Sequence, residues 1–488
     1  MKKKVISLML AACMVMGMTA CGSSASTTDT QPAADGTTAE TQAAATDDAA
    51  APTTESTGDK ELAVQIGPDP ETIDPALNSA VDGGNMLLHA YECLLTVGQD
   101  GTLQPGQAES YDVSEDGLTW TFHLRDGLKW SDGSDLTAND FVYSWKRVCD
   151  PEVAAPYAET VLGMVKGYDE AIDGNLDALG VSAPDDSTLV VELANPCSYF
   201  GSLAAFATLS PVQEATIEAN GEAWATAPET YVSNGPFYMT EWVPGSHITF
   251  SKNPYYWNAD AIKLDRLKFV LMEDSNAAYS AYQTGEVLMI KDVPTEEIPS
   301  LTGTDDFYVD PIIGTYYISL NIQKAPFDDV NVRKALSLAI DREYVASTLM
   351  QGTYTAAGNF MGPGWMDTDG TEFMSNANGG KPYIDTTNFE ATLEEAKQLL
   401  ADAGYPDGEG FPTVEYLYNT DDKHKKIAEA LQNMWQKELG VTVNLDNQDW
   451  NVFLQNRKNG DFQIARNGWI GDYNDPCTFL DMWYTGGG

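Results

Sequence analysis

Positive charge and histidine are scarce in this chain of 488 residues. Lys and Arg number 27 against 73 Asp and Glu, which gives a formal net charge of -46, and there are 4 His. So negative a chain repels phosphate backbones and anionic headgroups, which excludes nucleic acid as a partner. The acidity could favour a cationic ligand, although the solubility of an exported protein is the better explanation.

The chain also lacks the short motifs of common enzymes. Its histidines are scattered without H-E-x-x-H spacing, and no P-loop, G-x-S-x-G or G-x-G-x-x-G occurs. Asp472 and Asp475 could be imagined as a paired acid and base, but they lie three residues apart with no helix to align them. We therefore expect no enzyme activity, no catalytic residue, no metal site and no cofactor.

Cysteine is sparse too, and no apolar run after Ala20 is long enough to span a bilayer. Cys93, Cys149, Cys197 and Cys477 show neither C-x-x-C nor metal-ligand spacing. In an exported protein they could form two disulfides, and the sequence leaves open whether they pair.

The N-terminus has the pattern of an export signal. Lys2–Lys4 precede the apolar run Val5–Ala20, and the motif MTAC that ends at Cys21 resembles a bacterial lipobox. The motif LAAC that ends at Cys13 also fits, but it would leave a methionine-rich start. We therefore expect a signal peptide over residues 1–21 and lipidation at Cys21, which anchors the protein outside the cytoplasmic membrane or in the periplasm.

Residues 22–60 consist largely of Ser, Thr, Ala, Asp, Gly, Gln and Pro. Such a composition cannot bury a core, so we expect a disordered tether. The rest of the chain is long enough for two or three domains.

Hydrophobic periodicity predicts alternating strands and helices after the tether. In the first half we expect a strand at Glu61–Ile66, a turn at Glu109–Gly117, a strand carrying Trp120, Phe122 and Leu124, and a helix at Ala138–Arg147. In the second half we expect a helix after Asp329, strands at Val414–Tyr418 and Val441–Leu445 with a helix through Ile427–Trp435 between them, a helix at Asn451–Lys458 and a strand at Phe462–Ala465. The strand–helix–strand order of the second half predicts parallel pairing.

The stretch Arg466–Pro476 follows the last of these strands. Between Gly468 and Asp472 it carries a tryptophan, two glycines and a carboxylate. Ligands of α/β proteins collect beyond the carboxyl ends of strands, so Asp472 is placed like a ligand-facing charge. A surface turn rich in Gly, Asn and Asp is the alternative interpretation.

Two long runs, Asp116–Gly133 (DGLTWTFHLRDGLKWSDG) and Leu136–Arg147 (LTANDFVYSWKR), closely resemble the extracellular solute-binding proteins of family 5, which serve oligopeptide ABC importers. The resemblance continues in shorter segments, which are Leu179–Leu193, Pro196–Phe200, Ser233–Tyr238, Asn253–Trp257, Leu320–Leu336, Ala339–Arg342 and the residues around Trp469. It covers nearly all of the chain after the tether.

The resemblance implies an α/β, periplasmic-binding-protein-like fold of three domains in two lobes that close by a hinge. Domain I would take residues 61–91 and 215–314, domain II residues 92–214 and domain III residues 315–488. Family chains continue well past the residues that follow Trp469, so domain III is expected to be incomplete and the natural protein longer.

The resemblance also implies roles for single residues. Asp472 corresponds to the aspartate that binds the α-amino group of the peptide, and Gly468 belongs to the same loop. Trp450 and Trp469 correspond to aromatic residues of side-chain pockets, and Tyr157 to one that faces the ligand from the smaller lobe.

Positive groups are implied as well. Arg457, Arg466 and His424 correspond to groups that bind the carboxyl end or side chains of the peptide; the alternative is solvated surface charge. An acidic residue found near Ser79 in some relatives is missing here.

The expected function is that of a monomeric, lipid-anchored binding protein that captures oligopeptides and delivers them to an ABC permease. Dipeptides, nickel chelates or signalling peptides are alternative ligands, and a secreted hydrolase is the alternative of another class.

Overall fold

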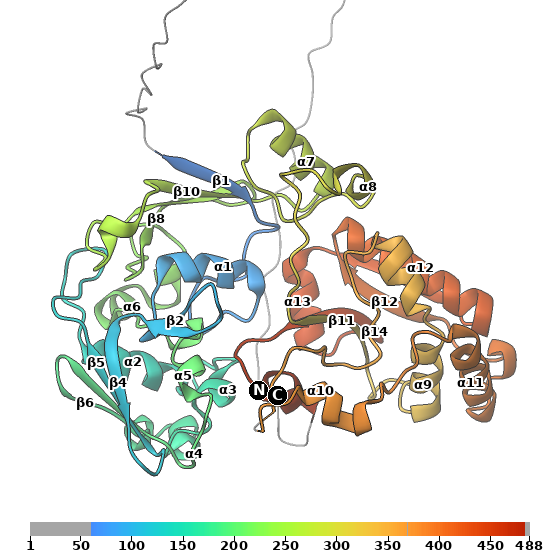
Figure 1. Cartoon of the computed structure of the whole chain (residues 1–488), viewed down its shortest axis with the longest axis horizontal. Helices are drawn as coiled ribbons and strands as arrows, with labels where there is room; N and C mark the ends of the chain where they lie inside the picture. Colours follow the sequence, from blue (N-terminus) through green and yellow to red (C-terminus); the bar gives the residue numbers. More distant parts are fainter. Residues whose placement is uncertain (1–59, 368, 484–488) are drawn as a thin grey trace, which may run out of the picture. The chain divides into compact units, whose positions relative to one another are not determined.

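The computed structural model describes residues 60–367 and 369–483 (Figure 1). The predicted signal peptide, Cys21 and residues 22–59 of the predicted tether lie outside the described residues. Within those residues, no helix is long and apolar enough to cross a membrane. The chain forms an N-terminal lobe (residues 60–313) and a C-terminal lobe (residues 314–483), which have separate sheets and largely separate hydrophobic cores. Tyr473 of the C-terminal lobe packs into the core of the N-terminal lobe. The predicted α/β fold of two lobes is confirmed; the three domain boundaries stay a prediction.

The first sheet of the N-terminal lobe joins segments far apart in the sequence. Its order is β1 (Glu61–Gln65), β10 (Arg266–Val270), β9 (His247–Lys252) and β8 (Phe237–Val243). β1 pairs with β10 in parallel, whereas the other pairs are antiparallel. The strand predicted at Glu61–Ile66 is thus confirmed.

The second sheet of this lobe is antiparallel. Its order is β4 (Ala108–Val113), β5 (Thr119–Leu124), β7 (Thr188–Glu192) and β6 (Val181–Asp185). Trp120, Phe122 and Leu124 are buried on one face of β5, as their alternation predicted. The turn predicted at Glu109–Gly117 is wrong in extent, because β4 pairs with β5 over most of that stretch.

The helix predicted at Ala138–Arg147 is α2 (Ala138–Val148), capped by Thr137 and Asp140 in a capping box. The other helices and strands of the N-terminal lobe are α1 (Val81–Ala90), β2 (Leu95–Val97), β3 (Leu103–Pro105), α3 (Ala158–Leu162), α4 (Tyr168–Ile172), α5 (Phe200–Leu203), α6 (Glu214–Asn220), α7 (Ser275–Thr284) and α8 (Ile298–Leu301).

The C-terminal lobe is built on one mixed sheet. Its order is β11 (Gly314–Leu320), β14 (Ile464–Ile470), β12 (Val414–Asn419) and β13 (Val443–Gln448). β12 and β13 are parallel and α12 (Asp422–Leu439) connects them, which confirms the predicted strand–helix–strand unit. β14 is parallel to β12 and antiparallel to β11.

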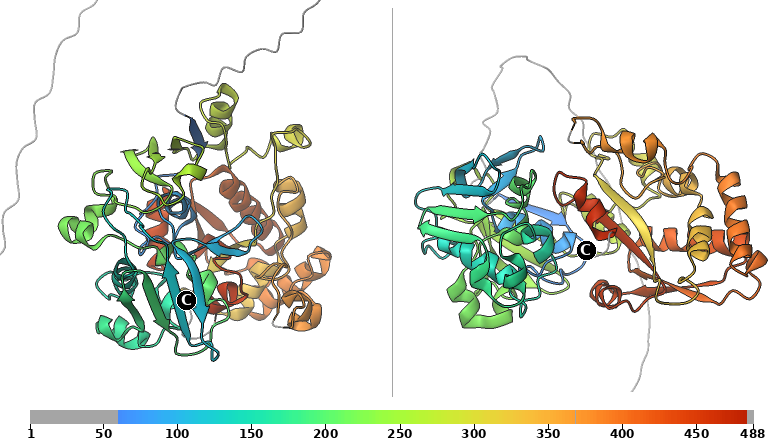
Figure 2. Two further views of the ribbon diagram at one scale, coloured as in Figure 1. Left: turned by 60° about the vertical axis from the view of Figure 1, so that its left-hand side comes forward. Right: turned by 90° about the horizontal axis from the view of Figure 1, so that it is seen from below.

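Helices cover both faces of this sheet, as Figures 1 and 2 show. Tyr416 and Ile464 point into the larger core cluster, and Leu417 and Ala465 point into a smaller cluster on the opposite face. The larger cluster is completed by α9 (Val330–Leu338), α11 (Phe389–Asp402) and α12, and the smaller one by α13 (Trp450–Lys458). α10 (Phe373–Asn376) and α14 (Cys477–Leu480) are short.

The extent of β14 corrects one prediction. The strand was expected to end at Ala465, before the glycines, but it continues to Ile470 because β11 pairs with it along its whole length. Trp469 therefore lies within the strand, and Asp472 follows just beyond its end.

Candidate functional site

Asp472 is a partly buried carboxylate that contacts the opposite lobe. The hydroxyl of Tyr157, at the start of α3, donates to Asp472 Oδ2 at 3.3 Å and Oδ1 at 3.5 Å. Burial raises the pKa of Asp472 to about 7, although the Tyr157 hydrogen bond lowers it. Within the described residues no lysine, arginine or histidine forms an ion pair with this carboxylate, so its charge lacks a counterion.

The loop after β14 holds Asp472 in place. The amide of Asp472 donates to Thr478 Oγ1 at 2.9 Å, and Trp469 Nε1 donates to the Thr478 carbonyl at 2.7 Å. A Cβ on Gly471 would lie 2.7 Å from the Trp365 ring, whereas one on Gly468 would meet only the Thr315 carbonyl at 3.9 Å. The close approach to Trp365 therefore requires glycine at 471, whereas the part of Gly468 in ligand binding stays a prediction.

Trp450, the first residue of α13, also contacts the opposite lobe. Its Nε1 donates to Asp82 Oδ2 at 3.1 Å, and its ring stacks on Phe453 with centroids 5.8 Å apart. Trp469 instead packs against Trp365 and Phe479 within the C-terminal lobe. The two predicted aromatic residues thus occupy different environments.

Asp82 is a polar residue of this region that the sequence did not indicate. It is 6% exposed, and among the described residues its Oδ1 has no hydrogen-bond partner. Burial raises its pKa, although backbone and Trp450 hydrogen bonds oppose the shift. It lies near the start of α1, and no motif of the sequence marks it.

Arg466 and Arg457 are held by amides rather than by carboxylates. Arg466 is 9% exposed, its Nε donates to Asn419 Oδ1 at 2.6 Å, and its guanidinium lies 5.3 Å from the Trp450 ring centroid. Arg457 Nη1 donates to Asn467 Oδ1 at 2.6 Å. Burial lowers the pKa of both groups. They are therefore not solvated surface charges, and neither forms an ion pair within the described part of the chain.

His424 lies in the first turn of α12, beside Tyr316. Its Nδ1 is 3.7 Å from Asp421 Oδ1 and has no hydrogen-bond partner among the described residues. Burial, with Arg466 and Lys423 nearby, lowers the pKa of His424 to about 2. The histidine is therefore neutral at physiological pH, and the positive charge expected there is absent.

Ion pairs also join the two lobes, and in each the lysine belongs to the C-terminal lobe. Lys423 lies 2.8 Å from Asp292, Lys458 lies 2.7 Å from Glu71, and Lys426 pairs with Glu296. Burial opposes the ionisation of Asp292, but the charge of Lys423 outweighs it and lowers the pKa of Asp292 to about 2.

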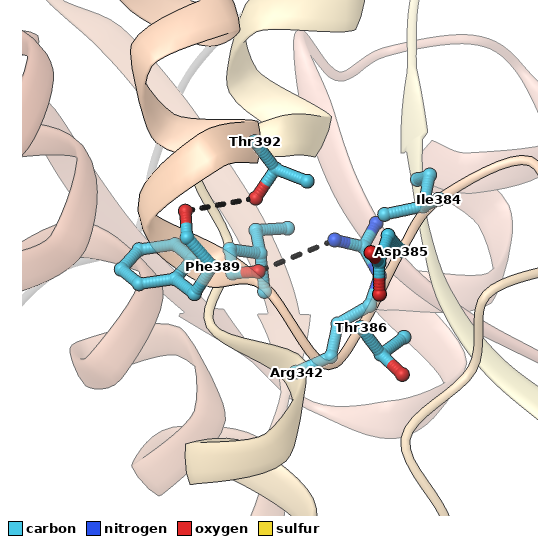
Figure 3. Close-up of a pocket in the computed structure, with 7 residues that line it drawn as sticks. Arg342, Ile384, Asp385, Thr386, Phe389 and Thr392 are labelled. Atoms are coloured by element: carbon cyan, nitrogen blue, oxygen red, sulfur yellow. Dashed lines mark hydrogen bonds between the residues drawn. The ribbon is translucent and has the colours of Figure 1, made fainter.

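Figure 3 shows a separate pocket near the start of α11. It is lined by Ile340, Arg342, Ile384, Asp385, Thr386, Phe389 and Thr392. Arg342 Nη1 donates to the carbonyls of Ser337 and Ile340 at 2.9 and 3.3 Å, which fixes the turn after α9. None of the predicted site residues lies here. No group of His, Cys, Asp and Glu suited to a metal ion occurs among the described residues.

Two relatives resemble the chain over most of its length. The oligopeptide-binding protein OppA of Bacillus subtilis (strain 168) is 38% identical over 435 residues, which are 88% of this chain and 78% of that protein. The crystal structure of the periplasmic oligopeptide-binding protein OppAIV from Borrelia burgdorferi has a TM-score of 0.81 at 35% identity and covers 87% of this chain and 83% of that one.

A third relative bears on the arrangement of the lobes. The structure of the Escherichia coli murein tripeptide binding protein MppA has a TM-score of 0.80 at 33% identity, covering 87% of this chain and 82% of that one. The unliganded open form of MppA reaches only 0.55 at 34% identity, covering 88% and 82%. The lobes of this chain are therefore not in that open arrangement, which agrees with their direct contacts at Asp472 and Trp450.

A sequence model of one family accounts for most of the chain. Residues 102–488 match the bacterial extracellular solute-binding proteins, family 5 Middle. This match and the relatives above show that the chain belongs to the bacterial extracellular solute-binding proteins of family 5.

Proposed function

We propose that the chain captures oligopeptides between its lobes and delivers them to an ABC permease, as a monomer anchored outside the cytoplasmic membrane by a lipid on Cys21. The observation that carries the peptide assignment is the pattern of charge in the site. Among the described residues, partly buried Asp472 has no basic partner, and neither buried Arg466 nor partly buried Arg457 has an acidic one. A ligand with a cationic end and an anionic end complements both.

The free α-amino group of a peptide suits Asp472. With a pKa near 8 this group is mostly cationic at neutral pH. A salt bridge to the carboxylate, in a site that closure shields from water, replaces the missing counterion. The two arginines then remain for the carboxyl end or for acidic side chains.

The aromatic residues suit ligands of varied sequence. Trp450 and Tyr157 present large surfaces beside the charged groups, and such surfaces accept many side chains through contact area. Peptides share their backbone and their ends, so a site that grips these and tolerates the rest favours oligopeptides. The names of the OppA relatives support the same class.

The first test identifies what the protein carries. The full chain is denatured after purification, and the released small molecules are analysed by mass spectrometry. Peptides of varied sequence are expected. A sugar, haem or nickel chelate would contradict the proposal, as would steady hydrolysis of an added peptide, which would indicate a secreted hydrolase.

The second test concerns Asp472. Substitution Asp472→Asn keeps the shape but removes the charge, and loss of one partner of a buried pair costs about 2 to 5 kcal/mol of binding free energy. Calorimetry with free and N-acetylated peptides of two to eight residues should show this loss for free peptides and little binding of acetylated ones. Asp475→Asn, three residues away, is the matched control and should bind normally. Equal binding of both peptide forms to the unaltered chain would refute the role of Asp472.

The anchor is tested separately. Intact mass measurement of protein extracted from membranes should show acyl chains on the N-terminal cysteine, and Cys21→Ser should release the protein into the soluble fraction. Retention of the Cys21→Ser protein at the membrane would contradict lipidation at this residue.

A further inference from the structure

The segment that follows β14 packs into both lobes. Tyr473 is 6% exposed and belongs to the core of the N-terminal lobe, where it stacks on Tyr199 with ring centroids 4.9 Å apart and planes at 12°. Only six residues later, Phe479 is fully buried against Met361 and Trp365 of the C-terminal lobe. This segment therefore connects the lobes at the Tyr199–Tyr473 stack.

Each of the two stacked tyrosines has a cysteine close to it in the sequence. Cys197 lies two residues before Tyr199, and Cys477 is the first residue of α14, four residues after Tyr473. Both are free thiols of intermediate exposure, and both pack against the same core cluster as Tyr473. The pKa of Cys477 is raised to about 12 by burial, by Asp475 and Asp481, and by the nearby thiol of Cys197.

The other two thiols are placed differently. Cys93 is buried in the N-terminal lobe, with its Sγ 3.2 Å from the Phe206 carbonyl and 3.3 Å from Ser210 Oγ. Cys149 is buried at the end of α2 in the same lobe. Among the four cysteines in the described residues, Cys477 is the one in the C-terminal lobe, and Cys197 is the partly exposed cysteine of the other lobe that lies near it.

We propose that Cys197 and Cys477 form a disulfide that locks the lobes together beside the Tyr199–Tyr473 stack. The bond joins Cys197, in the loop before α5, to Cys477, the first residue of α14. Neither position belongs to a strand ladder. A disulfide requires Cα atoms about 4.4 to 6.8 Å apart, and no ladder hydrogen bond holds either position against an adjustment to that separation.

The chemistry is thiol–disulfide exchange with a low-molecular-weight disulfide such as oxidised glutathione. The thiolate of one cysteine attacks oxidised glutathione, forms a mixed disulfide and releases one glutathione. The second cysteine then attacks this mixed disulfide and releases the second glutathione. In sum one S–S bond forms in the protein, one breaks in the oxidant, and the two cysteine protons end on the released glutathione thiols. An exported protein meets conditions in which such bonds persist. Thiols of raised pKa are poor leaving groups, so the cross-link, once formed, should exchange slowly.

The first experiment maps the bond and does not depend on any ligand. The full chain is incubated with oxidised glutathione, digested without reduction and analysed by mass spectrometry. A peptide pair that joins Cys197 to Cys477 in the monomer is expected, and Cys197→Ser should abolish it, whereas the matched control Cys149→Ser should not. Absence of this pair, or pairing through Cys93 or Cys149, would overturn the proposal.

The second experiment measures whether the disulfide holds the two lobes together. Small-angle X-ray scattering of the ligand-free chain should show a larger radius of gyration in the reduced form than in the oxidised form, with no difference for Cys477→Ser. Equal radii of oxidised and reduced chains would overturn the lock even if the bond forms. A third readout rests on the proposed function: a fluorescent peptide should leave the oxidised chain at least tenfold more slowly. Failure to bind any peptide, with the scattering difference intact, would count against the function and not against the disulfide.

Discussion

Asp292 and Asp472 are both largely buried carboxylates at contacts between the lobes, but their surroundings are opposite. Asp292 has Lys423 at 2.8 Å, and its pKa falls to about 2. Asp472 has no basic partner among the described residues and accepts from the Tyr157 hydroxyl instead, and its pKa rises to about 7. Ionised Asp292 is satisfied by the protein itself, whereas ionised Asp472 requires a cation from outside. The difference separates a carboxylate that holds the fold from one that is available to a ligand.

The largest effect expected from this comparison is on stability. Asp292→Ala leaves Lys423 partly buried without a counterion, and we expect a loss of about 3 kcal/mol in the free energy of unfolding. Asp472→Asn removes an unpaired buried charge, so at pH 7 it should change that free energy by less than about 1 kcal/mol or increase it. Urea unfolding of the ligand-free proteins measures both. Similar losses of unfolding free energy in the two variants would show that the two carboxylates do not differ in their contribution to the fold.

The two carboxylates should also respond to pH with opposite signs. The folded-state pKa of Asp472 is raised, so its contribution to stability is full below about pH 4 and is lost as the pH rises through 7. The pKa of Asp292 is lowered, so its contribution is present above about pH 4 and is lost as the pH falls toward 2.

Peptide binding should follow the titration of Asp472. Below pH 7 the carboxyl must lose its proton before it pairs with an amine, so affinity should fall up to about tenfold per pH unit, or about 1.4 kcal/mol. Above pH 8 the amine loses its charge, so binding should be strongest near pH 7 to 8. Calorimetry from pH 5 to 9 measures peptide affinity at each pH. In the control variant Asp472→Asn, the affinity should not fall below pH 7. A flat profile for the unaltered chain would contradict the assignment.

The smallest effect tests the one hydrogen bond that Asp472 receives from the opposite lobe. Tyr157→Phe removes this donor, so the ionised carboxylate loses about 1 kcal/mol of stabilisation and its pKa should rise further. The fall in peptide affinity should therefore begin at a higher pH. In an Asp472→Asn background the Tyr157→Phe substitution should not move the pH profile, and a shift there would assign the effect to packing.

Local structure was largely predictable where periodicity was strong. The apolar face of Ile427, Leu431 and Trp435 predicted α12, and the flanking strands predicted the parallel pairing of β12 with β13. The extent of β14 was not predictable, because Gly468 suggests a turn. The strand stays extended there because it pairs with β11, about 150 residues earlier in the chain. Tertiary pairing overrides local propensity at such positions.

The site was predictable in its residue types but not in its contacts. The resemblance indicated Asp472, Tyr157 and Trp450, yet nothing in the sequence places Tyr157 against Asp472, 315 positions away. Asp82 carries no motif and was missed. The neutral state of His424 could not be foreseen either, since it depends on burial beside Arg466.

The lysines that join the lobes give closure a dependence on ionic strength. Lys423, Lys426 and Lys458 of the C-terminal lobe all face carboxylates of the N-terminal lobe. Dissolved salt screens such attractions, most strongly where the side chains reach water, and the screening length is about 10 Å at 0.1 M. These three attractions between the lobes should therefore be strongest in dilute surroundings and should weaken as the salt concentration rises.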